Sequence, residues 1–165
     1  MANIATIKSR DIANGPGVRV SVFISGCTHH CRGCFNPETW DFNYGEPLTF
    51  QKISEIFSFA EPDYIDGITL LGGDPLCGED NQVASHAICH MFKSRFPSKT
   101  IWLYTGYQYD QIKHLPVMKH VDVLVDGPFI EEKKNLMLKF RGSENQRLID
   151  VKETRKQGKI VLLNM

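Results

Sequence analysis

Short apolar segments that end in unusual turns recur along this chain. Val18–Gly26 alternates in the way of a strand and is rich in β-branched residues. Three later runs share this character: Gly67–Leu71, Thr100–Tyr104 and Val121–Val125. We predict that all four are strands. Lys159–Leu163 is a weaker candidate for a late strand.

Stretches with helical periodicity separate these strands. The apolar residues of Phe50–Ala60 share one helical face, and Thr49 before them is a suitable N-cap. Further helices are predicted over Gln82–Phe96, which Pro97 ends, and over Tyr109–His114. Strands that alternate with helices form right-handed β–α–β units. The sequence therefore predicts an α/β fold, an incomplete, open (β/α) barrel of mostly parallel strands in a single domain.

The overall composition argues against several classes of protein. Nineteen basic residues balance nineteen acidic ones, whereas binders of nucleic acid or anionic membranes need an excess of Lys and Arg. No segment approaches the run of about 20 apolar residues that spans a bilayer. Residues 1–14 are mixed polar and lack the apolar stretch of a secretory signal. We expect a cytoplasmic protein that binds neither nucleic acid nor membranes.

Three of the five cysteines fall within eight residues, at Cys27, Cys31 and Cys34, directly after the first predicted strand. Three thiolates can hold three irons of a 4Fe–4S cube and leave the fourth iron open to a cofactor. Zinc is the alternative, with a histidine of this loop or Cys77 as the fourth ligand. Structural zinc sites usually pair two such loops, and no second one occurs here. We therefore favour an iron–sulfur cluster.

The carboxyl ends of the predicted strands carry the remaining unusual turns. Ligands gather at this edge of a parallel sheet. Besides the cysteine loop, the edge would carry Gly72-Gly73-Asp74-Pro75, Thr105-Gly106-Tyr107 and Asp126-Gly127-Pro128. We expect the four turns to form one site.

This arrangement resembles the radical S-adenosylmethionine superfamily, in which three cysteines with this spacing follow the first strand. The motifs Asn14–Arg19 and Ser25–Cys27 are similar to those of the glycyl-radical-enzyme activases. The subgroup that activates anaerobic ribonucleoside-triphosphate reductases has further similar motifs, at Gly72–Pro75, Trp102–Tyr107, Val125–Gly127 and Arg141–Arg147. Within one domain of residues 1–165 we take about 14–147 as the core, and the tail, 148–165, matches no motif.

The resemblance implies a function. A 4Fe–4S cluster on the three cysteines would cleave S-adenosylmethionine to methionine and a 5′-deoxyadenosyl radical. That radical would take a hydrogen atom from a glycine of the reductase. The cluster and the cofactor would carry this chemistry, so no catalytic acid or base is expected. The implied partners are the large subunit of an anaerobic ribonucleotide reductase and an external electron donor such as flavodoxin.

The resemblance also implies where the methionine part of the cofactor binds. Gly72, Gly73 and Asp74 would bind its ammonium group, through carbonyl oxygens or the Asp74 carboxylate. Some activases have a lysine for the carboxylate group shortly after the position of Asp126, and this chain has none. Arg19 or Arg141 would take that role.

The adenosine part would lie against other residues. Gly33, Cys34 and Phe35 would border the adenine, and Asn36 would form a hydrogen bond with the cofactor. Thr105 and Asp126, at the ends of neighbouring strands, would reach the ribose hydroxyls. Asp126 is equally suited to capping a turn.

Two alternatives stay open. One is a small radical S-adenosylmethionine enzyme that acts on a soluble substrate, of the deazapurine-synthase type, although it would need extra segments to cover a small molecule. The other is a non-catalytic iron–sulfur or zinc module. That module would leave the Gly-Gly-Asp-Pro turn and the motif at 14–19 unexplained.

Overall fold

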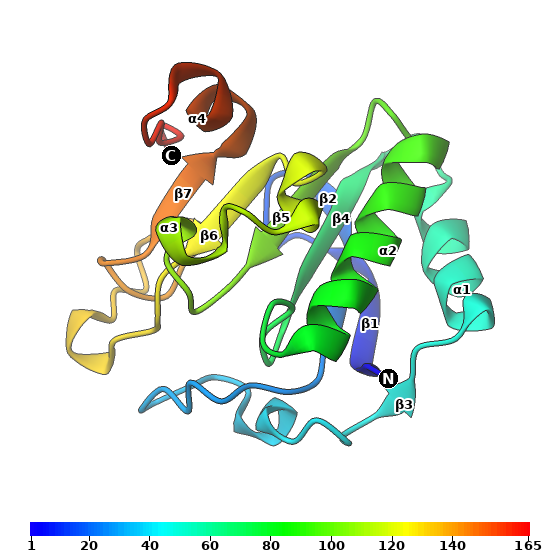
Figure 1. Ribbon diagram of the computed structural model, residues 1–165, viewed down its shortest axis with the longest axis horizontal. Coiled ribbons are helices and arrows are strands. Elements are labelled where there is room, and N and C mark those ends of the chain that lie inside the picture. The colour runs from blue at the N-terminus through cyan, green and yellow to red at the C-terminus, as the bar shows by residue number, and fades with distance from the viewer.

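A seven-stranded mixed sheet organises the chain in the computed structural model, which describes residues 1–165 (Figure 1). The strand order is β3-β1-β2-β4-β5-β6-β7, and the sheet does not close on itself. The strands are β1 Asn3–Asp11, β2 Val18–Ile24, β3 Glu46–Pro47, β4 Ile65–Gly72, β5 Thr100–Tyr104, β6 Val123–Asp126 and β7 Arg147–Asp150.

The four central strands are parallel and follow one another in chain order. β2 pairs with β4, β4 with β5 and β5 with β6, as the four predicted strands require. The edges are antiparallel, because β1 runs against β2 and β7 against β6. The predicted α/β class is confirmed. The antiparallel edges were not predicted, since β1 is a largely exposed strand that buries only Ile4 and Asp11 and so lacks an apolar pattern.

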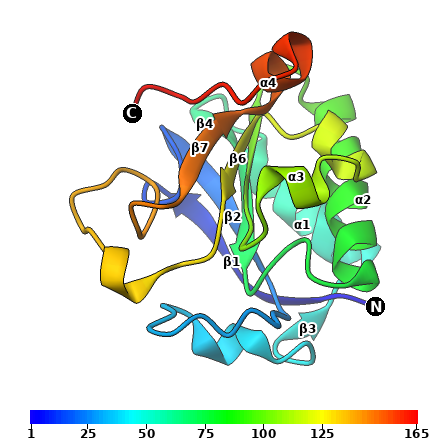
Figure 2. The same ribbon diagram turned by 60° about the vertical axis from the view of Figure 1, so that its left-hand side comes forward.

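Helices cover one face of this sheet (Figure 2). They are α1 Phe50–Ala60, α2 Glu79–Arg95, α3 Tyr109–Ile112 and, after β7, α4 Val151–Gln157. The Thr49 hydroxyl accepts the Lys52 N–H at 3.1 Å, which confirms the predicted N-cap of α1. The suggested late strand is reduced to one isolated bridge, Ile149 to Leu162. None of the helices combines the length and apolar character needed to cross a membrane.

The two faces of the sheet are packed differently. Ile101 and Leu103 of β5 belong to the main core, under the helices. Trp102, between them in the sequence, packs on the opposite face, in a smaller cluster that includes Val125 and Leu148. Short 3₁₀ helices occur at Pro37–Trp40 (η1), Pro116–Lys119 (η2) and Glu131–Lys133 (η3). The segment 127–146, which contains η3, lies over the face without helices (Figure 2).

Candidate functional site

A cavity of about 590 Å³ lies on the face of the sheet that the helices leave free. Phe23, Leu71 and Tyr104 line it, and their strand neighbours belong to the main core on the other face. All four carboxyl-end turns also contribute to its lining: Cys27, Gly72–Asp74, Thr105–Gly106 and Gly127. The expected convergence of these turns is confirmed. The volume is within the range of cofactor sites.

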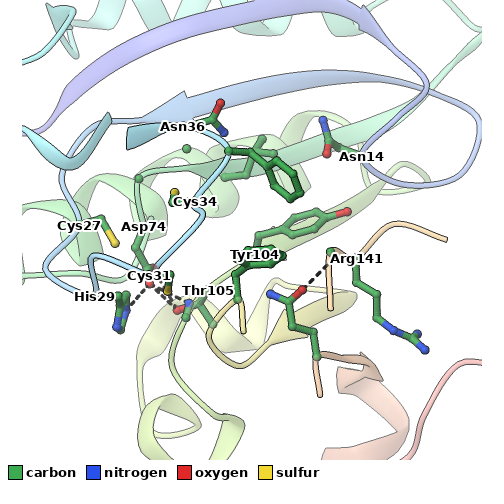
Figure 3. Close-up of a pocket in the computed structure, with 18 of the residues that line it drawn as sticks. Asn14, Cys27, His29, Cys31, Cys34, Asn36, Asp74, Tyr104, Thr105 and Arg141 are labelled. Atoms are coloured by element: carbon green, nitrogen blue, oxygen red, sulfur yellow. Dashed lines mark hydrogen bonds and ion pairs between the residues drawn. The ribbon is translucent and has the colours of Figure 1, made fainter. Parts of the chain in front are cut away.

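The three cysteines of the loop lie together at one end of this cavity (Figure 3). None of them forms a disulfide. Burial raises the pKa of the Cys27 thiol to about 12, although backbone N–H groups of His29 and His30 partly oppose this. Burial also raises the pKa of Cys31. These thiols must lose protons to bind a metal, and the N–H groups near Cys27 would stabilise its thiolate.

The donor set fits an iron–sulfur cluster. Three thiols and no further cysteine ligand face a cavity large enough for a cofactor on the open iron. No three His, Cys, Asp or Glu residues have their donor atoms arranged around a single metal position. Such a shared position is not expected for a 4Fe–4S cluster, because each cysteine binds a different iron.

Backbone contacts attach the cysteine loop to the glycine turn. The Asp74 N–H donates to the Gly26 carbonyl at 2.9 Å, and the Gly26 N–H donates to the Thr39 carbonyl at 2.7 Å. A Cβ on Gly73 would lie 2.6 Å from the Thr39 oxygen and 2.8 Å from the Gly26 oxygen. Only glycine permits this approach. The cysteine loop and the turn thus form one packed unit.

The Asp74 carboxylate joins that unit to the end of β5. It is 1% exposed and accepts the N–H groups of Leu76 and Gly106, both at 2.9 Å. It also accepts the Thr105 hydroxyl at 3.0 Å and pairs with His29 Nε2 at 2.7 Å (Figure 3). The bond to Asp74 raises the pKa of His29, although burial opposes it. His29 therefore shapes the loop.

The predicted ribose contacts differ in position. Thr105 lines the cavity, but its hydroxyl already donates to Asp74 and accepts the Tyr107 N–H at 3.2 Å. Asp126 is not among the lining residues. Its carboxylate accepts Arg147 Nη2 at 2.6 Å and the Tyr109 N–H, in the first turn of α3, at 2.8 Å. The geometry favours the turn-capping role of Asp126 that the sequence left open.

The predicted adenine contacts lie where the cysteine loop leaves the cluster end. Cys34, Phe35 and Asn36 line the cavity. Gly33 does not line it and serves the loop backbone instead, with a φ of +77°. The Phe35 ring is 58% exposed and lies 5.1 Å from the ring of Phe129, centroid to centroid.

Neither arginine suits the methionine carboxylate. Arg19 is fully buried and donates to Thr69 Oγ1 at 2.9 Å and to the Thr100 carbonyl at 2.8 Å, away from the cavity. Burial lowers its pKa to about 10. Arg141 does line the cavity, but at the end far from the cysteines, and its side chain extends away from them (Figure 3). The expectation that Arg19 binds the methionine carboxylate was wrong, because its guanidinium is already hydrogen-bonded to Thr69 and Thr100 within the sheet.

Some lining residues carried no signal that sequence reasoning used. Lys8 lies on β1, a strand that was not predicted. Tyr104 lies on a predicted strand, but no prediction was made of which side of the sheet its side chain faces. Asn14 begins the motif at 14–19, to which the sequence assigned no place in the cavity, and its amide donates to Asp11 at 2.6 Å. Register within a sheet decides which side chains of a strand face a cavity. The period-2 pattern of β5 was therefore the available clue for Tyr104.

Comparison with known proteins places the chain in a family. The family model described as "4Fe-4S single cluster domain" matches residues 13–149. Over 140 residues the chain is 45% identical to the anaerobic ribonucleoside-triphosphate reductase-activating protein of Enterobacteria phage T4, covering 84% of this chain and 87% of that protein. Proteins of the same name from Salmonella typhi and Escherichia coli strain K12 are 40% and 39% identical, over 82% of this chain and 90% of theirs. This chain belongs to that family.

Membership in this 4Fe-4S family decides between the two metals. The matched residues include the whole cysteine loop and every turn that lines the cavity. A three-thiol loop beside a cofactor-sized cavity is what a cluster with one open iron requires, whereas zinc would need a fourth protein ligand. Cys77, the distant candidate for that ligand, is buried with its sulfur 3.4 Å from the Thr28 N–H, and it supports the loop.

Proposed function

We propose that this chain activates an anaerobic ribonucleoside-triphosphate reductase by cleaving S-adenosylmethionine reductively and leaving a glycyl radical on the reductase. The observation that carries the proposal is the convergence of three cysteine thiols and the Gly72–Asp74 turn on one cavity. The names of the relatives, all reductase-activating proteins, support the choice of partner.

The residues of the chain would bind and orient rather than transfer protons. Cys27, Cys31 and Cys34 would hold a 4Fe–4S cluster and leave one iron without a protein ligand. When bound, the cluster supplies the electron that splits the cofactor into methionine and a 5′-deoxyadenosyl radical. Asp74 would keep the cysteine loop and the end of β5 in register through His29 and Gly106.

The Gly72–Asp74 turn would bind the methionine ammonium through its carbonyl oxygens. The Asp74 carboxylate is a weaker candidate, since four protein donors already surround its two oxygens. Cys34, Phe35 and Asn36 would border the adenosine. Thr105 would accept a ribose hydroxyl through its remaining lone pair and would donate to one only by giving up its bond to Asp74. Asp126 would act behind the site.

An apolar rim marks the place where the reductase would dock. Leu136 and Met137 are 81% and 89% exposed, in the segment that covers the cavity, and Phe35 contacts the same segment. Exposed apolar side chains grouped at a cavity mouth are typical of a binding surface. We assign this rim to the reductase loop that carries the glycine. Arg141, which lines the same cavity, would donate to a carbonyl of that loop.

The open sheet suits a protein substrate. We propose that it is the incomplete (β/α) barrel expected from sequence, in which the absence of closure lets a peptide approach the cluster. Flavodoxin as electron donor and the cytoplasmic location stay predictions.

The test is an anaerobic activation assay. Reconstituted protein, S-adenosylmethionine, a strong reductant and a matched reductase should give the doublet of a glycyl radical in electron paramagnetic resonance. Replacing the target glycine by alanine should remove that signal, and deuterium at its Cα should appear in 5′-deoxyadenosine. Cofactor cleavage that never yields a protein radical with a matched reductase would favour the small-substrate alternative instead.

A further inference from the structure

Three histidines that the cavity does not use lie together on the helix-covered side of the sheet. His86 and His90 are one helical turn apart on α2, so their side chains share a face of that helix. His120 follows η2, which packs against α2. The ring centroids of His86 and His90 are 5.9 Å apart, and that of His120 lies 5.3 Å from the first and 5.2 Å from the second.

These separations are those of imidazoles around one metal ion. A zinc–nitrogen bond of about 2.1 Å places each ring centre roughly 3.2 Å from the metal. Two rings at a tetrahedral angle then have centres about 5.2 Å apart. Two of the three observed separations, 5.2 and 5.3 Å, agree with that value. The third, 5.9 Å, needs only a small approach of His86 and His90.

The hydrogen bonding of His86 also leaves a ligand atom free. Its Nδ1 is buried and has no hydrogen-bond partner. A buried ring nitrogen without a partner is costly, and coordination to a metal would satisfy it. None of the three histidines belongs to the cavity lining, so they are not part of the cofactor site.

The rings have freedom to turn toward a common point. Their nitrogens do not surround one metal position in the structure, so metal binding requires the rings to reorient. His90 is exposed, and His86 and His120 are half-buried. The χ2 rotation of histidine is soft, so the rings can realign without backbone movement.

The surrounding charges do not exclude a cation. Lys93, one of two lysines near His120, is engaged by Asp122 at 2.8 Å and by the Lys99 carbonyl at 2.9 Å. The other, Lys119, is exposed. Asp122 also pairs with Lys152 at 2.9 Å, so its carboxylate offsets these lysines and adds no free negative charge.

We propose that His86, His90 and His120 bind one divalent transition-metal ion, with zinc as the expected metal and water as its fourth ligand. Neutral imidazole nitrogens are preferred ligands of Zn²⁺, Ni²⁺ and Cu²⁺. The bound ion ties η2 to α2 and so stabilises the connection between β5 and β6. This site is separate from the cysteine loop and does not depend on the proposed function.

Zinc binding to the cluster-loaded protein tests the site, because loaded cysteines do not compete for zinc. Equilibrium dialysis in excess ZnCl₂, followed by elemental analysis, should find one zinc besides the iron of the cluster. His90→Gln is the main variant, since an exposed side chain can be changed without unfolding the protein. It should weaken zinc binding at least tenfold and leave the iron content unchanged. His86→Gln and His120→Gln should do the same, with folding checked by circular dichroism.

His114→Gln is the matched control, because His114 is exposed and outside the cluster of rings. It should bind zinc as the unaltered protein does. Zinc should raise the Tm of both and fail to raise the Tm of His90→Gln. Absence of zinc uptake, or equal uptake by His90→Gln and His114→Gln, would overturn the proposal. Either result leaves cluster content and cofactor cleavage as they were, so it is distinguishable from failure of the proposed function.

Discussion

Asp74→Asn separates two roles for the buried carboxylate between the cysteine loop and β5. In the structure its Oδ1 accepts the Leu76 N–H, whereas its Oδ2 accepts the Gly106 N–H and pairs with His29. An amide that keeps its oxygen toward Leu76 turns its NH₂ group toward Gly106 and His29. The Gly106 N–H then loses its acceptor, and the His29 bond loses its charge.

The size of this loss follows from the number of bonds. Hydrogen bonds to charged groups contribute about 1.5–3 kcal/mol each, so two of them give roughly 3–6 kcal/mol. For a domain of this length 1 kcal/mol lowers the Tm by about 2–4 °C. We therefore expect Asp74→Asn to lower the Tm by at least about 6 °C and to weaken S-adenosylmethionine binding, because the cysteine loop separates from the β5 turn.

Two controls and two assays make the result decisive. Asp80→Asn makes the same chemical change at a carboxylate that is 69% exposed and pairs with the Met1 amino group. Exposed ion pairs contribute little to stability, so this variant should lower the Tm much less than Asp74→Asn does. His29→Gln removes one charged contact and should fall between the two. Thermal unfolding and calorimetric binding of S-adenosylmethionine are then compared. An Asp74→Asn protein with an unchanged Tm and lost cofactor affinity would refute the reasoning and make Asp74 a direct ligand of the ammonium group.

The remaining predictions test other parts of the molecule. Cys27→Ala, Cys31→Ala and Cys34→Ala should each abolish the cluster, whereas Cys89→Ala, in the main core, should keep about four irons; iron retained by any of the first three contradicts the ligand assignment. Leu136→Ser with Met137→Ser should reduce the glycyl radical yield about tenfold, or 1.4 kcal/mol of docking energy, without changing cofactor cleavage in the absence of reductase; equal loss of both activities would argue against docking there. Burial opposes ionisation of Asp122, but bonds from Lys93, the Ile101 N–H and Lys152 outweigh it and lower the pKa of Asp122. Its stabilising effect is therefore present above the ordinary pKa of 3.8 and lost as the pH falls through the lower folded value. Asp122→Asn should cost about 2 kcal/mol of unfolding free energy at neutral pH and much less near about pH 3, and denaturant titrations that show the same cost at both would refute it.

Most of the fold could be predicted because its elements have local patterns. β5 and α1 occur at the expected residues, since the apolar period and the Thr49 cap are contained in a few neighbouring positions. β1 and β7 escaped prediction for the opposite reason. β1 is an exposed edge strand, and β7 is a strand of four residues that owes its place to pairing with β6. Pairing between distant segments leaves little trace in either sequence.

The candidate site shows the same division. The cysteine spacing predicts a cluster from eight residues alone, and parallel topology brings the four turns together. Partners of single polar groups could not be predicted, because they come from distant segments. Asp126 meets Arg147, and Arg19 meets Thr69 and Thr100. The His86, His90 and His120 cluster likewise depends on His120, which comes 30 residues after His90 and 34 after His86 in the sequence.

The contact between Gly73 and Gly26 has a consequence for separating cluster from cofactor by mutation. Sequence alone predicts that a bulky residue at Gly73 weakens cofactor binding and spares the cluster. In the structure a Cβ there would lie 2.8 Å from the Gly26 oxygen and 2.9 Å from its nitrogen, next to Cys27. Backbone atoms cannot rotate away as a side chain can, so the cysteine loop itself must move. Gly73→Val should therefore lower iron content and cofactor affinity together, and a variant with full iron and weak cofactor binding would show that the loop yields independently of the turn.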